Sequence, residues 1–441
     1  MNTMTDNYLT PDALAVIERA KALAPKLAAR AQQADREGKI SDETVQEMAE
    51  AGLFRVLQPK RWGGYEMDPR VFYSVQMELA KGCMSTAWIY GVVGVHPWQL
   101  ALFPDQAQQD VWGKDNGVRI ASTYMPTGKA EPVEGGFRFN GRWSFSTGSK
   151  HCDWLFLGGL LPKRDGTPGL EHVTFLVPKA DYRIEDNWDV LGLRGTGSHD
   201  IVVENAFVPA HRIQYTNDHS DVGCPGRTEN TSWLFRIPFT HVFQRAVSTA
   251  CLGALESAIA SFTERATAHV GKHGNRMAED VNAQTAVTEA TIALDQLKMV
   301  LFRNYARIVD AAKTGIQLTL EERLLQRAQA SYVPKLTGFH ANELMRACAA
   351  SGTFKNNPIE RIFRDIHQGR THIANNTDAY VRAYGSHVLG IPNQEPFVWL
   401  NSGQAAAALS QRRLPPACIC DSPSIKQKID GDKVWQNKNM T

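Results

Sequence analysis

Apolar residues recur every three or four positions between Ala13 and Ala51, and this spacing predicts helices across the start of the chain. A second helix is expected after Ser41, because acidic residues fill the turn that follows this serine. Asp68 and Pro69 predict the start of a further helix. The N-terminal part of the chain is therefore predicted to be helical.

Residues 82–104 contain no Asp, Glu, Lys or Arg, and the segment is long enough to cross a bilayer. It also contains Ser85, Thr86, His96 and Gln99, and such side chains are costly in a membrane without partners. No second span is visible in the sequence. We therefore predict a helix buried inside the protein, at a place where a cofactor or substrate can lie.

The pattern changes after Asn116-Gly117 to short runs of β-branched and aromatic residues, separated by Gly, Pro and Asn. Long helical periods return after about Asn230, and no sustained period follows Gly390. The predicted domains are an N-terminal helical domain (1–115), a central β domain (116–226), a C-terminal helical bundle (227–395) and a poorly ordered tail (396–441).

Charge and composition exclude several classes of protein. The 441 residues include 48 Lys and Arg against 46 Asp and Glu, and a net charge of +2 is unsuited to binding nucleic acid. The polar N-terminus lacks the features of a secretory signal, so we expect a cytoplasmic protein. The seven scattered cysteines predict reduced thiols, and no motif for a metal, a P-loop or a Rossmann dinucleotide site is present.

Two hydroxyl-rich stretches at predicted strand ends, 122–128 and 143–148, contain aromatic residues as well. Such stretches suit hydrogen bonding to a flat polar heterocycle, although ordinary turn chemistry explains them equally well. Aromatic residues near them, among them Trp88 and Phe145, favour a flat ligand or serve as core packing.

Three histidines are candidates for proton chemistry. On one continuous helix, His367 and His372 would point about 140° apart and could not easily share a metal ion. That helix is either a solvated face or the carrier of a proton-handling histidine. His96, in the predicted buried helix, is either a satisfied core residue or a catalytic one.

Taken in order, four segments resemble the acyl-CoA dehydrogenase superfamily: residues 50–54, 59–65, 191–200 and 202–209. The resemblance covers about residues 15 to 392. It implies an α+β fold with an N-terminal helical domain, a central β-barrel or sandwich and a C-terminal four-helix bundle.

Within that superfamily, residues 85–88, 95–103, 143–151 and 363–372 resemble the oxygenase components of two-component flavin monooxygenases. The similarity is to hydroxylases of p-hydroxyphenylacetate and of a phenolic secosteroid. It implies an enzyme that takes reduced FMN or FAD from a separate flavin reductase and hydroxylates an aromatic, phenolic substrate with O2 through a C4a-hydroperoxyflavin. The superfamily also implies a homotetramer.

The same resemblance assigns residues to roles. It places His372 near the flavin, gives Thr147 the N5 proton to hold, and puts His96 and Ser122 beside the phenol. Residues 267–276 replace an arginine-rich stretch of the family, so the flavin phosphate would be held by Lys272 or Arg276. The remaining flavin contacts implied are Trp88, Ser122, Phe145, Ser146 and Thr147.

Two other functions are open at this stage. One is a dehydrogenase or oxidase of the same fold with tightly bound oxidised flavin, although no glutamate lies near His372 in the sequence to remove an α-proton. The other is a non-catalytic scaffold that binds a ligand. The colour of the purified protein would separate them, because only the dehydrogenase is expected to be yellow.

Overall fold

Five helices form the N-terminal part of the computed structural model, which describes residues 8–164, 166–215, 224–268, 270, 274 and 276–391. Two of the predicted starts are confirmed, because the Ser41 side chain accepts a hydrogen bond from the Thr44 amide and Asp68 accepts one from Arg70. The helices are α1 (Pro11–Glu37), α2 (Asp42–Glu50), α3 (Pro69–Gly82), α4 (Met84–Leu100) and α5 (Asp105–Trp112).

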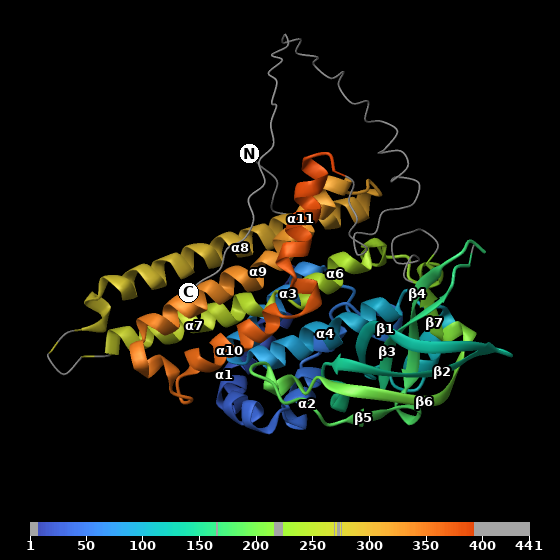
Figure 1. Ribbon diagram of the computed structural model, residues 1–441, viewed down its shortest axis with the longest axis horizontal. Helices are drawn as coiled ribbons and strands as arrows, with labels where there is room; N and C mark the ends of the chain where they lie inside the picture. Colours follow the sequence, from blue (N-terminus) through green and yellow to red (C-terminus); the bar gives the residue numbers. More distant parts are fainter. Residues whose placement is uncertain are drawn as a thin grey trace, which may run out of the picture. The chain divides into compact units, whose positions relative to one another are not determined.

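Helix α4 is buried along its whole length, as predicted from its lack of charge. It passes so close to its neighbours that a methyl group added to Gly91 would lie 2.1 Å from the Gln76 amide nitrogen and 2.5 Å from the Ala246 carbonyl oxygen. Figure 1 shows α4 between the strands and the C-terminal helices. Whatever binds beside α4 is therefore shielded from water on several sides.

The β lobe is a seven-stranded mixed sheet in the order β5-β6-β2-β1-β3-β4-β7, where a barrel or sandwich had been expected. Strand β1 pairs in parallel with β3 through its first half and antiparallel with β2 through its second half. A register shift between Thr123 and Gly128 separates the two halves, so β1 joins both parts of one sheet. The strands are β1 (Ile120–Val133), β2 (Gly136–Ser146), β3 (Trp154–Pro162), β4 (Leu170–Pro178), β5 (Arg183–Glu185), β6 (His199–Pro209) and β7 (Ile213–Tyr215).

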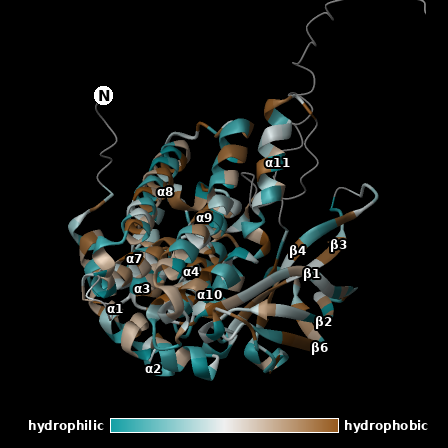
Figure 2. Cartoon of the chain, turned by 60° about the vertical axis from the view of Figure 1, so that its left-hand side comes forward, coloured by the Kyte–Doolittle hydropathy of each residue, from teal (hydrophilic) through white to brown (hydrophobic). Residues whose placement is uncertain are grey.

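Helices α7 to α10 form the bundle, with contacts between α7 and α8, α8 and α9, α9 and α10, and α10 and α7. Hydrophobic and hydrophilic residues alternate along α8 in Figure 2, as expected for a helix with one face in a core. The C-terminal helices are α6 (Phe239–Ala246), α7 (Ala250–Ala268), α8 (Val281–Thr314), α9 (Leu320–Ala347), α10 (Pro358–Arg370) and α11 (Thr377–Val388).

One described stretch, Phe239–Ala268, is long and apolar enough to cross a bilayer, but 67% of its apolar 18-residue window is buried within the protein. This stretch contains α7, which contacts α3, α8, α9 and α10, so its apolar surface is used in the bundle.

The predicted last helix was wrong in one respect. The sequence pattern suggested one continuous helix from Ile359 to Gly385, whereas α10 ends at Arg370 and α11 begins at Thr377. The Asn375 side chain holds the break, because it donates to the carbonyl oxygens of Gly369, at 2.8 Å, and Val247, at 2.9 Å. His372 therefore lies in a connection, and the angle of 140° to His367 does not apply.

The predicted domain boundaries at residues 116 and 227 fall between these groups of elements, and we keep them as a proposal. The proposed tail, residues 396–441, lies outside the described residues.

Candidate active site

His96 lies in the last turns of α4, buried against the β lobe. Its Nδ1 is 2.6 Å from the carbonyl oxygen of Ile120, which can only accept, so Nδ1 carries the proton. Burial lowers the pKa of His96 to about 4, and the bond to Ile120 opposes this only in part. Its Nε2 is buried without a hydrogen-bond partner among the described residues. A neutral imidazole therefore presents an unused acceptor in an apolar place.

Aromatic side chains pack against the His96 ring and against its neighbour Tyr124. The ring centroids of Phe156 and Tyr124 lie 5.4 Å and 6.4 Å from that of His96, both edge-on. Helix α6 adds Phe239 and Phe243, whose centroids lie 5.5 Å and 5.3 Å from Tyr124. The predicted residue Ser122 is buried on β1. Burial raises the pKa of Tyr124 well above its usual value, and hydrogen bonds to Ser122 and Gln99 lower it in part.

Tyr124 and Gln99 were missed in the sequence. The Tyr124 hydroxyl donates to Gln99 Oε1 at 2.5 Å, and Gln99 Nε2 is buried without a partner among the described residues. Two signals pointed to them. Tyr124 is two residues from Ser122 and so shares its face of the strand, and Gln99 is three residues from His96 and so shares its face of the helix.

The end of β2 and the turn that follows it carry three predicted residues, one of them in an unusual backbone conformation. Phe145 has a φ of +68°, a conformation that costs energy for a non-glycine residue, and the residue is 60% exposed. The next residue, Ser146, is fully buried, and its hydroxyl has no partner among the described residues. The Thr147 hydroxyl is buried 2.8 Å from that of Ser198. An exposed ring thus adjoins two buried hydroxyls, one of them without a partner.

The loop between β5 and β6 joins this region to α10 and α1. The Leu193 amide donates to Asp365 Oδ1 at 2.6 Å, and burial raises the pKa of Asp365 to about 7. Arg364 binds Asp35 of α1 through two bonds of 3.0 and 2.9 Å. A methyl group on Gly192 would lie 2.1 Å from the Arg364 carbonyl oxygen, so this loop is pressed against α10.

His372 caps the short 3-10 helix Ile373–Asn375, and its Nδ1 accepts a hydrogen bond from the Ala374 amide at 3.1 Å. Burial, together with the positive charge of Arg327, lowers the pKa of His372 to about 4. The neutral ring must then carry its proton on Nε2. Trp88 of α4 lies edge-on to it, with 5.9 Å between centroids.

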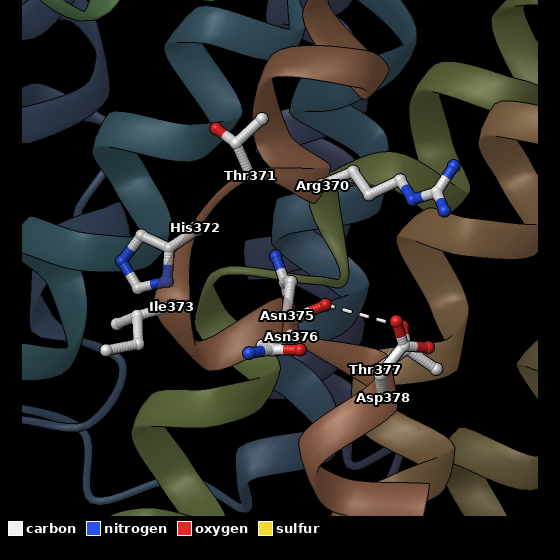
Figure 3. Close-up of a pocket in the computed structure, with 8 residues that line it drawn as sticks. All are labelled: Arg370, Thr371, His372, Ile373, Asn375, Asn376, Thr377 and Asp378. Carbon is white, nitrogen blue, oxygen red and sulfur yellow. Dashed lines mark hydrogen bonds between the residues drawn. The ribbon is translucent and has the colours of Figure 1, made fainter. Parts of the chain in front are cut away.

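A cavity of about 360 Å³ opens at the break between α10 and α11 (Figure 3). Its lining is polar, and the acid in it is Asp378, which is exposed. The lining residues are Arg370, Thr371, His372, Ile373, Asn375, Asn376, Thr377 and Asp378.

One turn of α4 brings the two predicted flavin segments to the same place. Trp88 contacts His372, and a methyl group on Gly148, next to Thr147, would lie 3.1 Å from Ile89 Cγ2. His96 is eight residues further along, about 12 Å at 1.5 Å per residue. The helix therefore links a hydroxyl and a histidine at one turn to a second histidine two turns away.

The predicted phosphate contacts are not part of this arrangement. Arg276 is exposed in the connection between α7 and α8, and Figure 1 shows the end of α7 and the start of α8 remote from the strands. Lys272 lies outside the described residues. Within one chain, Arg276 does not meet Thr147 or His372.

Two family models match the chain. Residues 10–115 match the N-terminal domain of acyl-CoA dehydrogenases, and residues 246–377 match their C-terminal domain. The chain therefore belongs to the acyl-CoA dehydrogenase family, which confirms the predicted fold class.

Relatives place it among the monooxygenases of that family. The flavin-dependent monooxygenase oxygenase subunit HsaA of Rhodococcus jostii is 37% identical over 87% of this chain and 100% of its own length. The oxygenase component of the FADH2-dependent resorcinol hydroxylase of a Rhizobium species is 28% identical over 85% and 94%. The structure of XiaF from a Streptomyces species, in complex with FADH2 and glycerol, superposes with a TM-score of 0.80 at 27% identity, over 87% and 97%. The predicted enzyme class, a flavin-dependent monooxygenase, is confirmed.

Proposed function

We propose that this chain is the oxygenase component of a two-component flavin-dependent monooxygenase and that its substrate is a phenol. The observation that carries the proposal is the opposite protonation of two histidines, the fully buried His96 and the partly exposed His372. His96 offers an acceptor at Nε2, whereas His372 offers a donor at Nε2. A phenol needs an acceptor for its hydroxyl, and a negatively charged oxygen formed during O2 activation needs a donor.

The reaction replaces one C–H bond of the aromatic ring with a C–OH bond. One atom of O2 enters the ring and the other leaves as water, and both electrons come from reduced flavin, which becomes oxidised. When bound, the reduced flavin supplies the electrons that activate O2. His96 accepts the phenol hydrogen bond, Ser122 and Tyr124 orient the ring, and Thr147 and His372 hold protons at the flavin side. The aromatic walls and the fully buried α4 keep water out.

The residues present fit a flavin. Ser146 offers a buried hydroxyl without a partner among the described residues, and Phe145 exposes a ring beside it. Trp88 and His372, whose rings are in contact, add an aromatic ring and a donor. These residues and Thr147 would hold the ring system, and FMN and FAD are both open.

A dehydrogenase of the same fold is the runner-up. It needs a carboxylate that removes an α-proton from the substrate. Asp378 is the acid among the residues that line the described cavity, but it is exposed, and Asp365 already binds the Leu193 amide. A non-catalytic scaffold would not need two histidines held in opposite tautomers. The oxygenase is therefore favoured over both.

Reduced flavin should bind more tightly than oxidised flavin, by about tenfold or more. The reduced form makes one hydrogen bond that the oxidised form lacks, and the oxidised form leaves one buried polar group without a partner. Anaerobic titration with FMN and FAD, in both redox states, measures the ratio. Equal affinities, or tighter binding of the oxidised form, would remove the two-component proposal and favour the dehydrogenase.

We also propose a flavin reductase as partner, a cytoplasmic location and a homotetramer in which a neighbouring chain completes the flavin site. The remote position of Arg276 supports the last point, because a phosphate contact from it requires another chain. Apolar side chains on the outer faces of α8 and α9 would lie in the interface: Ile292, Met299 and Phe339, all more than half exposed.

Light scattering should therefore find four chains per particle. Phe339→Glu should lower that number, because an interface charge without a partner is costly, whereas Arg276→Gln should keep four chains and weaken flavin binding. A wild-type monomer that binds flavin with full affinity would contradict the shared site.

A further inference from the structure

Three buried hydroxyls form a chain that begins at the proposed flavin site. Thr147 Oγ1 lies 2.8 Å from Ser198 Oγ, and Ser198 Oγ lies 2.8 Å from Thr196 Oγ1. Thr196 Oγ1 then donates to the Leu193 carbonyl oxygen at 2.8 Å. The three side chains are between 2% and 6% exposed, so water does not compete along the chain.

The direction of every bond in this chain follows from its last member. A carbonyl oxygen has no proton to give, so the single hydroxyl proton of Thr196 must point to Leu193. Ser198 must then donate to Thr196, because Thr196 has no second proton. By the same reasoning, Thr147 must donate to Ser198. The Thr147 hydroxyl is left with lone pairs and no proton for any other partner.

The carbonyl that sets this direction is held firmly. The Thr196 amide and the Trp188 indole nitrogen also donate to the Leu193 oxygen, each at 3.1 Å. On the other side of the residue, the Leu193 amide is bound to Asp365. Leu193 also has a φ of +52°, a conformation that persists only when its surroundings fix it. The acceptor at the end of the chain therefore cannot easily turn away.

We propose that Thr196 and Ser198 are positioning residues that fix Thr147 as an acceptor and thereby select the redox state of the flavin. This inference rests on the proposed function. The N5 of a reduced flavin carries a proton and donates, whereas the N5 of an oxidised flavin only accepts. Thr147 can accept a hydrogen bond from the N5 of reduced flavin. With oxidised flavin, two acceptors would face each other. The preference for reduced over oxidised flavin thus originates in Ser198 and Thr196, the second and third members of the hydrogen-bonded chain, which do not contact the flavin themselves.

Matched variants test the chain through the ratio of the dissociation constants of oxidised and reduced flavin, measured anaerobically. Thr196→Val removes the hydroxyl and keeps the shape, whereas Thr196→Ser keeps the hydroxyl. Thr196→Val and Ser198→Ala should each lower the ratio by roughly fivefold or more, because Thr147 becomes free to donate to oxidised flavin. Thr196→Ser should keep the wild-type ratio.

A double variant separates this role from general support of the loop. If Thr196 and Ser198 act through Thr147, Ser198→Ala should leave the ratio unchanged in a Thr147→Val background. Circular dichroism would first show that each protein is folded, and Thr196→Val replaces Ser198→Ala if the latter is not.

The outcomes are distinct. A wild-type protein without preference for reduced flavin would overturn the proposed function and this inference together. A wild-type preference that stays the same in Thr196→Val and Ser198→Ala, or a loss of affinity equal for both redox states, would overturn this inference alone. A ratio that Thr196→Ser lowers as much as Thr196→Val does would also overturn it.

Discussion

His372→Ala should slow hydroxylation by about 30- to 1,000-fold, which corresponds to ~2–4 kcal/mol for the loss of a preorganised donor to a developing negative charge. The structure identifies the donor: Nδ1 accepts a hydrogen bond from the Ala374 amide, so only Nε2–H can donate to the developing negative charge. Stopped-flow mixing of protein, reduced flavin, substrate and O2 would measure the rate, and the yield of hydrogen peroxide would measure the fraction of turnovers that fail.

His367→Ala is the matched control, since His367 lies on α10 with its ring against Phe363, at 4.1 Å between centroids, and its Nδ1 beside the Phe363 carbonyl. It should react at close to the wild-type rate. A larger loss in His367→Ala than in His372→Ala would mean that the wrong histidine has been chosen, and a wild-type rate in His372→Ala would remove it from the mechanism.

His96→Asn should lower the hydroxylation rate by about 100-fold, the lower end of what a positioned acid or base contributes. An asparagine amide can still donate to the Ile120 carbonyl in place of Nδ1, so the change removes the Nε2 acceptor and spares the fold. His96→Gln, which returns an acceptor near the position of Nε2, should recover part of the rate. Equal rates for wild type and His96→Asn would contradict the assignment.

The pH profile gives an independent check on the same residue. Because burial lowers the pKa of His96 to about 4, its acceptor is available above that pH and is lost as the pH falls toward 4. Between pH 6 and 8 the hydroxylation rate should therefore not follow the titration of His96. A wild-type inflection near pH 6.5 that disappears in His96→Asn would show that the imidazole is exposed to water.

Much of the fold could be predicted because its strongest signals are local. A helix with no charged residue, such as α4, is expected to be buried in the interior. Ser41 and Asp68 fix the starts of their helices through hydrogen bonds within one turn. The end of α10 was missed because its cause is distant. The Asn375 amide reaches Val247 on another segment of the chain, and the periodicity of the sequence carries no trace of that contact.

The candidate site divides in the same way. Trp88 and His372 were named separately from the sequence, and the fold brings their rings together. Thr196 and Ser198 lie in residues 191–200, which resemble a family signature, but neither was predicted to be a site residue. Their role depends on which oxygen atom accepts from which hydroxyl and on the direction of each hydrogen bond. The spacing of residues in the sequence predicts neither.

The complete burial of α4 also bears on how the protein is made. During synthesis this uncharged helix leaves the ribosome long before α6 and α7, which cover it and begin at Phe239 and Ala250. Until α6 and α7 have been synthesised, the nascent chain exposes a hydrophobic surface of the kind that chaperones bind. Fragments that stop before these helices would expose the same surface, so the N-terminal half is a poor candidate for expression on its own.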